Sequence, residues 1–295
     1  MRADQLLVAR GLASSRSQAV RLIESGARWQ RAGQADDAWR VLRKSDDLDD
    51  DAIVEINDES EAKYVSRGGL KLEGALRESG VSVQGLRCLD VGQSTGGFTD
   101  CLLQHGAAHV VGIDVGHGQL HPRLHADPRV LCLEKINARQ LQASQVLTPQ
   151  LIAHYDHMTV TLGSNFSKPS DLQLSLHAGS PERGFELIVG DLSFISQTLV
   201  WPALLPLLAV GGVMLMLVKP QFELQPEQIG KGGIVRDAAF YPLVEQRMRA
   251  ASLALGLEVK HYINSPITGG DGNREFFIHL TQTTGSHRAS TGVTP

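Results

Sequence analysis

The sequence predicts an α/β protein whose main domain is a mostly parallel sheet covered by helices. Two observations carry this prediction. From about residue 84, short apolar segments typical of strands alternate with segments typical of helices. A glycine-rich loop directly follows the first of these strands, which is where such sheets bind ligands. The 295 residues are 42% hydrophobic and 20% charged, so we expect a well-buried core, and the composition excludes global disorder.

Charge separates a small N-terminal unit from the rest. Residues 1–44 carry nine Lys or Arg and four acidic residues, and the acidic stretch "DDLDDDAIVEINDESE" follows. This change of sign predicts a separate domain over residues 1–60. Within it, "ASSRSQAVRLIESG" predicts a short helix, with Ser15 and Gln18 as a capping box and Gly26 at its end.

The main domain contains seven strand candidates and two helix candidates. The strands are "RCLDVG", "HVVGIDVG", "RVLCLE", "ELIVGD", "GVMLMLVKP", "EVKHYI" and "REFFIHLTQ", and the helices are "GGFTDCLLQHG" and "FYPLVEQRMRAASLALG". Residues 142–184 interrupt this alternation and predict a polar surface segment with a short helix at "TPQLIAHYDH"; the pattern of this segment indicates no function. Residues 283–295 predict a disordered tail.

Residues 199–218 have no charge over twenty positions, which is long enough to span a bilayer. Pro202 and Pro206 interrupt the first half and Gly211-Gly212 the middle, so a helix, a glycine turn and a core strand explain the segment better. The N-terminus lacks the apolar core of a signal peptide, and the three cysteines form no CxxC pair. We therefore expect a cytoplasmic protein without a membrane span.

The loop in "LDVGQSTGGFTD", residues 89–100, predicts a nucleotide site. A P-loop would need Lys-Ser/Thr where Phe98-Thr99 stands, and the dinucleotide fingerprint would need glycine at Ser94. S-adenosylmethionine (SAM) fits better, because its cation suits an acid at the strand end, followed by a glycine turn. Asp114 ends the next strand, but an acid there fits NAD as well as SAM. A tight turn without a ligand stays an alternative.

Four ionisable residues are candidates for the chemistry: Lys71, Asp191, Lys219 and Glu275. Asp191 and Lys219 end neighbouring strand candidates, on the sheet edge where ligands bind. Spacing alone cannot bring Lys71 or Glu275 to the same place, and a single lysine after a strand is usually solvated.

The chain resembles the TlyA, or hemolysin A, family of bacterial ribosomal RNA (rRNA) ribose methyltransferases. The resemblance lies in "YVSRGGLKLEGAL", "LDVGQSTGGFTDCLLQHGA", "DVGHGQL", "NAR", "DLSFIS", "LVKPQFE", "KGGIVRD" and "SPITGGDGNREF". It extends to the N-terminal "RGLASSRSQAVRLIESG", which is similar to an S4-type RNA-binding module and implies a small α+β RNA-binding domain at residues 1–60. The resemblance implies a Rossmann-like SAM-dependent methyltransferase sheet at residues 67–282, after a linker at 61–66.

The resemblance also implies the site residues. The tetrad for ribose 2′-O-methylation falls on the four candidates already named, Lys71, Asp191, Lys219 and Glu275. The implied cofactor site comprises Asp90, Gly92, Ser94, Thr95, Gly96, Gly97, Phe98, Asp114 and, near the adenine, Asn137. Gln93 departs from the family, which often has a small residue there, and "GARWQRAGQADDAW" is a poor match to the usual end of the RNA-binding module.

The residue types suggest a mechanism. A lysine acts as a base only if burial or a neighbouring cation lowers its pKa, and we expect Lys219 in this role with Lys71 as the cation. Asp191 and Glu275 would orient the lysines and the hydroxyl. No His/Cys cluster suggests a metal, so none is expected.

The expected substrate is rRNA or a ribosomal subunit, with cytidine as the target, and the expected state is a monomer. Arg10, Arg16 and Arg21 are candidate phosphate contacts, although a solvated helix face explains Arg16 and Arg21 equally well. Two alternative functions remain open: a membrane-active hemolysin and a catalytically silent RNA-binding protein.

Overall fold

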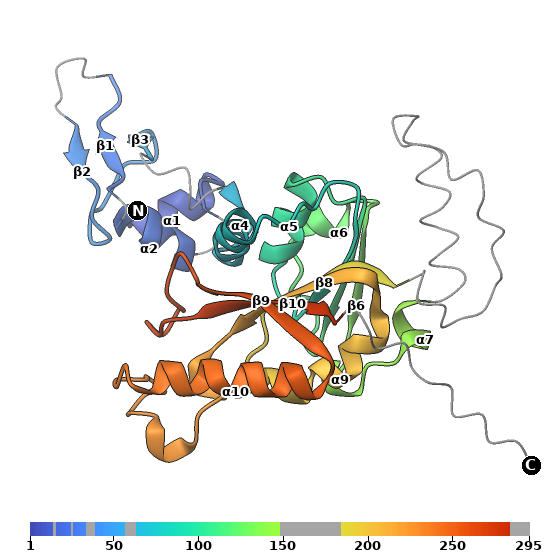
Figure 1. Cartoon of the computed structure of the whole chain (residues 1–295). Helices are drawn as coiled ribbons and strands as arrows, with labels where there is room; N and C mark the ends of the chain where they lie inside the picture. Colours follow the sequence, from blue (N-terminus) through green and yellow to red (C-terminus); the bar gives the residue numbers. More distant parts are fainter. Residues whose placement is uncertain (14–15, 25, 34–38, 57–62, 148–183, 284–295) are drawn as a thin grey trace, which may run out of the picture.

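The computed structural model describes residues 1–13, 16–24, 26–33, 39–56, 63–147 and 184–283. The N-terminal residues form a lobe beside a larger layered domain (Figure 1). The proposed Ser15 cap, the "TPQLIAHYDH" helix, most of the 142–184 excursion and nearly all of the expected tail lie outside the described residues.

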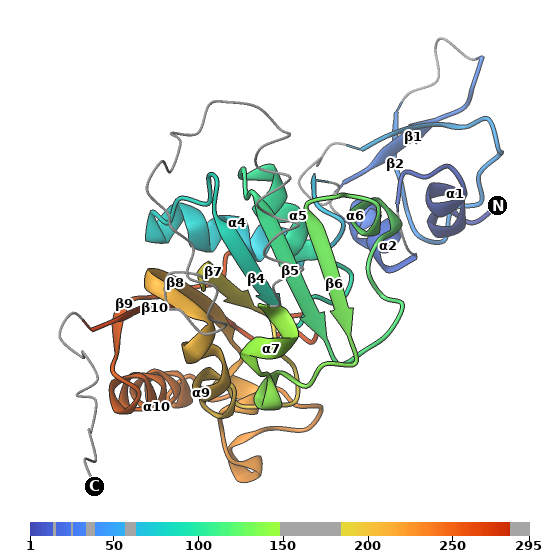
Figure 2. The same ribbon diagram turned by 90° about the vertical axis from the view of Figure 1, so that its right-hand side faces the viewer.

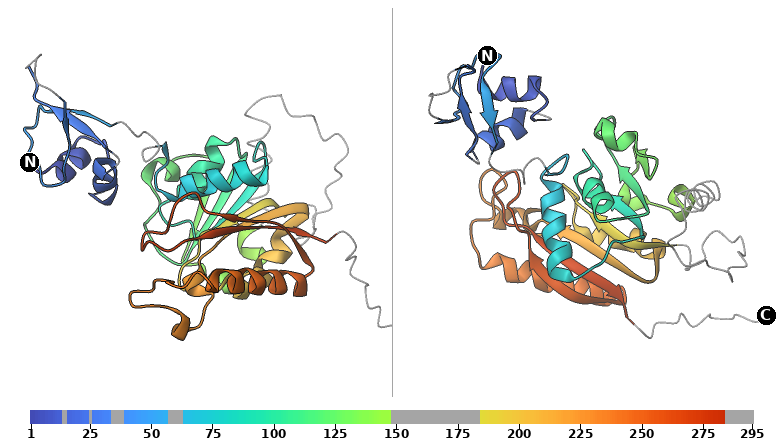
Figure 3. Two further views of the ribbon diagram at one scale, coloured as in Figure 1. Left: turned by 60° about the vertical axis from the view of Figure 1, so that its left-hand side comes forward. Right: turned by 90° about the horizontal axis from the view of Figure 1, so that it is seen from above.

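The N-terminal lobe pairs two helices with a small sheet, as expected for an α+β unit. Helices α1 (Ala3–Ala9) and α2 (Arg16–Glu24) pack on the antiparallel strands β1 (Arg28–Gln30), β2 (Arg40–Val41) and β3 (Ile53–Glu55), in the order β2-β1-β3. Their shared core is aliphatic, with Leu7, Leu22 and Leu42 almost fully buried. Figure 3 shows this lobe set apart from the layered domain.

All seven predicted strands form one sheet. They are β4 (Arg87–Val91), β5 (His109–Asp114), β6 (Val130–Glu134), β7 (Phe185–Gly190), β8 (Leu208–Val218), β9 (Leu257–Asn264) and β10 (Phe276–Gln282). The order is β6-β5-β4-β7-β8-β10-β9, and only β10 runs antiparallel to its neighbours. The chain reverses its direction of travel across the sheet between β4 and β7, and this is the position where open α/β sheets bind ligands.

Helices cover both faces of the sheet (Figure 2). One face is covered by α4 (Gly68–Ser79) and the predicted α5 (Gly97–Gln104), through side chains such as Leu72 and Leu102. The other is covered by α7 (Ala143–Val146), α9 (Trp201–Leu204) and the predicted α10 (Phe240–Ala254). The sequence reading missed α4, because its glycines obscured a helical apolar pattern.

Short elements complete the layered domain. They are α6 (Pro122–His125) and the 3₁₀ helices η1 (Ala138–Gln140), η3 (Gln197–Leu199), η4 (Leu205–Leu207), η5 (Pro220–Phe222) and η6 (Pro226–Gln228). Most of them lie in the loops that connect the strands, where 3₁₀ turns are frequent.

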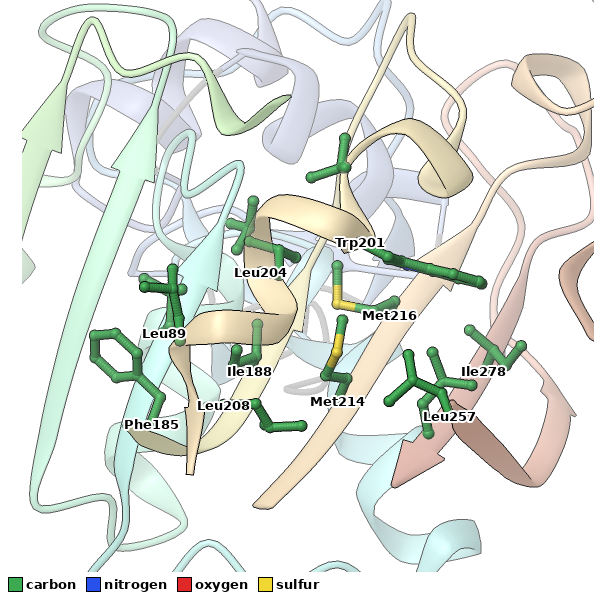
Figure 4. Close-up of a cluster of buried hydrophobic side chains, with 14 of the residues drawn as sticks. Leu89, Phe185, Ile188, Trp201, Leu204, Leu208, Met214, Met216, Leu257 and Ile278 are labelled. Carbon is green, nitrogen blue, oxygen red and sulfur yellow. The ribbon is translucent and has the colours of Figure 1, made fainter. Parts of the chain in front are cut away.

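The apolar segment 199–218 is part of the core. It forms the end of η3, then α9, η4 and the strand β8, with Trp201 fully buried against Met216 and its neighbours (Figure 4). The expected glycine turn is wrong. Gly211 and Gly212 lie inside β8, where the pairing with β7 jumps from Leu208 to Val213, so the glycines form a bulge within the strand. Every helix in the described ranges is too short or too polar to span a bilayer.

Tyr64 belongs physically to the layered domain. It falls within the expected 61–66 linker, yet its side chain is almost completely buried in the core beneath α4 and α5. The backbone N–H of Val65 also donates to the Asp100 carboxylate of α5 (2.8 Å). The proposed domain limits stay predictions, and the chain is anchored to the layered domain by Tyr64.

Candidate active site

A chain of buried hydrogen bonds underlies the glycine loop. Asp90 of β4 is fully buried, and its carboxylate accepts from the Thr99 hydroxyl (2.7 Å). The Gln93 amide donates in turn to the Thr99 oxygen (2.9 Å). Burial raises the pKa of Asp90 to about 7, although the Thr99 hydrogen bond acts in the opposite direction. The acid at the strand end is thus held by Thr99 rather than by solvent.

Gln93 fits because the adjacent strand leaves room for it. A Cβ on Gly112 of β5 would lie 2.0 Å from the Gln93 side chain. The glycine therefore accommodates the residue that departs from the family pattern. On the other side of the loop, Gly92 has φ +84°, and a Cβ there would lie 2.6 Å from the Asp191 carbonyl oxygen.

A cavity of about 160 Å³ opens beside this loop. Its walls come from four segments that are distant in the sequence: the start of α4, the glycine loop, the segment after β7 and the end of β8. The lining residues are Ser66, Gly68, Gly92, Gln93, Ser94, Thr95, Gly97, Phe98, Asp191, Ser193 and Lys219. Five of the nine predicted cofactor residues line it; Asp90, Gly96, Asp114 and Asn137 do not.

Gly96 and Gly97 of the loop allow neighbouring segments of the chain to pack closely against it. A Cβ on Gly96 would lie 2.3 Å from Leu124, and one on Gly97 would lie 2.2 Å from the Ser66 hydroxyl. Gly97 thereby brings the start of α4 against α5 at the rim of the cavity. The cofactor contacts of both glycines stay predictions.

Asp114 and Asn137 lie together at the carboxyl edge of the sheet. The Asp114 carboxylate accepts from the backbone N–H groups of Ser94 (2.7 Å) and Gly116 (2.6 Å), so it ties the glycine loop to the loop after β5. Asn137 is exposed and caps η1 by accepting from the Arg139 N–H, one residue after Ile136 donates to the Asp114 carbonyl. This position suits the predicted contacts with ribose and adenine.

The four candidate catalytic side chains form two ion pairs. Lys71 of α4 and Glu275, just before β10, are 2.6 Å apart with side chains 9% and 3% exposed. Lys219, after β8, and Asp191, after β7, are 2.5 Å apart. Burial raises the pKa of Glu275, partly offset by Lys71, and the charges of Lys219 and Asp191 also influence it. The fold therefore brings together residues that sequence spacing could not.

Close packing of α4 explains how Lys71 reaches Glu275. A Cβ on Gly69 would lie 2.2 Å from the Tyr64 ring, and one on Gly74 would lie 2.6 Å from Pro266 in the segment after β9. A Cβ on Gly269 would lie 2.7 Å from the Glu275 carboxylate. These glycines bring α4 and the 265–275 segment to contact distance.

Three functional candidates escaped the sequence reading. Ser193 accepts a hydrogen bond from the Lys219 ammonium (2.9 Å), and Ser66 lines the cavity. Phe194 is 91% exposed, packs against Phe222 and has φ +63°, a strained value for an aromatic residue. Both Ser193 and Phe194 belong to "DLSFIS", so the motif was the available signal.

The candidate phosphate-binding arginines are engaged within the N-terminal lobe. Arg16 forms two hydrogen bonds with the buried Asp4 carboxylate (2.8 and 3.1 Å) and holds the pKa of Asp4 below its usual value. Arg10 donates to the backbone carbonyls of Ala52 and Asp50. The Arg21 side chain lies outside the described atoms. Their phosphate contacts stay predictions.

Within the described part of the chain, no group of three or more His, Cys, Asp or Glu side chains could hold a metal ion. The polar cavity, with an acid at its wall and backbone loops on either side, fits an organic cofactor that carries a cation.

Comparison with known proteins identifies two domains. Residues 64–282 match the FtsJ-like methyltransferase family, and residues 1–27 match the S4 domain. A Mycobacterium tuberculosis protein named 16S/23S rRNA (cytidine-2′-O)-methyltransferase TlyA is 38% identical over 96% of this chain and 90% of its own length. A Brachyspira hyodysenteriae protein named Hemolysin A is 33% identical over 95% of this chain and 99% of its own length.

A solved structure from Streptococcus thermophilus, provisionally described as a hemolysin, is also similar. It is 34% identical with a TM-score of 0.65, covering 96% of this chain and 88% of that one. The expected family and fold are confirmed.

Proposed function

The chain belongs to the FtsJ-like methyltransferase family, and we propose that it methylates the 2′-hydroxyl of ribose in rRNA, with cytidine as the target nucleotide. This proposal rests on two ion pairs, Lys71–Glu275 and Lys219–Asp191, which lie at one edge of the sheet. Lys219 and Asp191 line the cavity beside the glycine loop, so the second pair lies where a cofactor would meet a substrate.

The cofactor that fits this cavity is SAM, which supplies an electrophilic methyl group when bound. Asp191 lies at the cavity wall and would stabilise a neighbouring cation, and the loop at residues 92–97 would contact the amino-acid end. Asp114, at the end of β5, would accept the ribose hydroxyls of the cofactor in place of part of its present backbone hydrogen bonding.

Lys219 is the proposed base. Its side-chain nitrogen lies between the Asp191 carboxylate (2.5 Å) and the Ser193 hydroxyl (2.9 Å), which fixes its orientation. Lys219 would first release a proton to solvent, and the neutral amine would then accept the proton of the ribose 2′-hydroxyl as that oxygen attacks the methyl group. Asp191 and Ser193 would orient the amine, Glu275 would position the hydroxyl, and Lys71 would be the neighbouring cation that favours the neutral form of Lys219.

Phe194 supports a nucleic-acid substrate. Its ring is almost fully exposed, one residue from a cavity-lining serine, in a strained backbone conformation that is costly to maintain. Exposed aromatic rings stack on unpaired bases, and a base taken out of its stack would present its ribose to Lys219. The S4 domain at residues 1–27 supports the same class of substrate.

A Lys219→Ala variant tests the assignment. Transfer of tritiated methyl from SAM to ribosomal subunits should fall by at least about a thousandfold, as for loss of a general base combined with loss of positioning. SAM binding, measured by calorimetry, should change much less. Near-normal turnover by this variant would refute the assignment of the base.

The target nucleotide follows from a mapping experiment. Sites of 2′-O-methylation in rRNA should be compared between cells with and without this protein, and at least one cytidine should lose its methyl group in the deletion. The alternative of a silent RNA-binding protein predicts identical maps.

The hemolysin alternative has weaker structural support. The apolar segment 199–218 is built into η3, α9, η4 and β8 and supplies much of one core, so exposing it would require unfolding. Leakage from liposomes at low concentrations of pure protein would revive this alternative. Cytoplasmic location and a monomeric state stay predictions.

A further inference from the structure

Asn273 joins two loops at the catalytic edge. The residue is 2% exposed, and both polar atoms of its side-chain amide have hydrogen-bond partners. The amide oxygen accepts from the Val235 N–H (2.9 Å), and the amide nitrogen donates to the Gly233 carbonyl (2.9 Å) and to the Asp271 carboxylate (2.8 Å). A buried amide with three hydrogen bonds of this kind fixes the position of both loops.

The same network reaches both ion pairs. Glu275 is two residues after Asn273 and pairs with Lys71. Gln221 is two residues after Lys219 and donates to the Asp271 carboxylate (3.1 Å). Asp271 therefore connects the segment after β8 with the segment before β10, and Asn273 adds the loop at residues 230–236 to that assembly.

The topology places this loop on the substrate side. The chain leaves β8 at the carboxyl edge and remains there until α10 crosses back to start β9, whose direction matches that of β8. Residues 230–236 lie within this connection. They fold on themselves through hydrogen bonds from the Gly230 N–H to the Ile234 carbonyl and from the Gly233 N–H to the Gly230 carbonyl.

Two cations project from this docked loop. Lys231 and Arg236 are both exposed, and neither makes an ion pair or side-chain hydrogen bond among the described residues. Many cations elsewhere on this domain are paired, for example Arg249 with Glu245 and Lys260 with Glu258, although Arg77, Lys135 and Arg139 are exposed and unpaired among the described residues. What sets Lys231 and Arg236 apart is that the loop carrying them is held by Asn273, and fixed unpaired cations suit an anionic partner.

We propose that residues 230–236 are an RNA-contact element of the catalytic domain, in which Lys231 and Arg236 neutralise phosphates next to the methylated ribose. Asn273 is the positioning residue that holds this element in register with Glu275. The inference rests on the proposed function, and it adds a second RNA-binding surface to that of the S4 domain.

The charge is tested with a Lys231→Gln/Arg236→Gln double variant of the full chain. The matched control is Arg249→Gln/Lys260→Gln, which removes two exposed cations from α10 and β9. RNA affinity is measured by filter binding to rRNA at several salt concentrations, and KM and kcat by methyl transfer to ribosomal subunits.

The loop variant should bind RNA roughly tenfold more weakly, and its slope of log affinity against log salt should be shallower by about 1.5–2, as for two lost phosphate contacts. KM should rise in parallel, with a much smaller change in kcat. If the loop variant and the control lose the same affinity and slope, the inference is wrong.

The docking is tested with Asn273→Asp. This change keeps the shape but places a second carboxylate oxygen against the Gly233 carbonyl and Asp271. The variant should have a higher KM and a lower kcat, and its slope of log affinity against log salt should be shallower. The reason is that residues 230–236 are no longer held in a fixed position relative to Glu275. If the variant is less stable to heat but its slope of log affinity against log salt is unchanged, Asn273 stabilises the fold and does not position an RNA-contact element.

The two readouts separate this inference from the proposed function. If the unaltered protein transfers no methyl group, the proposed function fails. Filter binding still decides whether Lys231 and Arg236 contact RNA.

Discussion

Lys71 and Glu275 illustrate how strongly a single residue depends on its partner. Both side chains are nearly buried, and burial already raises the pKa of Glu275. Lys71→Met leaves the carboxylate without its cation, which should lower the free energy of unfolding by about 3–5 kcal/mol. Chemical denaturation at pH 8 measures this, and the loss should shrink at low pH, where Glu275 is protonated. A Lys71→Met/Glu275→Leu variant should recover part of the stability; strict additivity of the two changes would contradict the pairing.

Asp90 has a predictable pH dependence at the same scale. Because burial raises its pKa from the usual 3.8 to about 7, the folded protein retains a proton that the unfolded chain releases. Its contribution to stability is complete below about pH 4 and is lost as the pH rises through 7. Between pH 5 and pH 8 the wild type should lose about 2–3 kcal/mol relative to Asp90→Asn. Parallel stability curves for the two proteins would show that Asp90 stays ionised.

Helix α4 is the element that completes the site, and its position depends on glycine. Gly74→Ala would place a methyl carbon 2.6 Å from Pro266 and push α4 away from the segment that carries Glu275. Overpacking of this kind costs about 1–3 kcal/mol, and we expect methyl transfer to fall by roughly tenfold or more because Lys71 moves. The control is Glu78→Ala, an exposed position on the same helix. If both variants keep full activity, the distance between α4 and the 265–275 segment does not limit catalysis.

At the scale of the whole molecule, we expect the two lobes to have separate roles. Removing residues 1–60 should spare SAM binding and abolish modification of rRNA, because the S4 domain lies in the removed part. Tyr64 must be retained, since it is buried in the catalytic core. Calorimetry with SAM and tritium transfer to ribosomal subunits measure the two properties. Equal activity on subunits without the N-terminal lobe would assign recognition to the catalytic domain alone.

Local pattern was enough to predict much of this protein. The seven strands, α5 and α10 follow from apolar runs bounded by glycine and polar residues, because strands and helices express periodicities that are written in consecutive residues. The glycine loop, with Asp90 before it and Asp114 at the end of the next strand, is readable for the same reason. Family resemblance, rather than spacing, supplied Lys71 and Glu275.

Tertiary structure alone decided which side chains meet. The Lys71–Glu275 pair requires the sheet order that places β10 beside β8, and it requires glycines at 69, 74 and 97 that let α4 pack closely. The bulge at Gly211-Gly212, the raised pKa of Asp90 and the bridge made by Asn273 are equally invisible in the linear chain. Each depends on contacts between segments that are distant in the sequence. The close approach and desolvation of these segments cannot be predicted from the periodicity of consecutive residues.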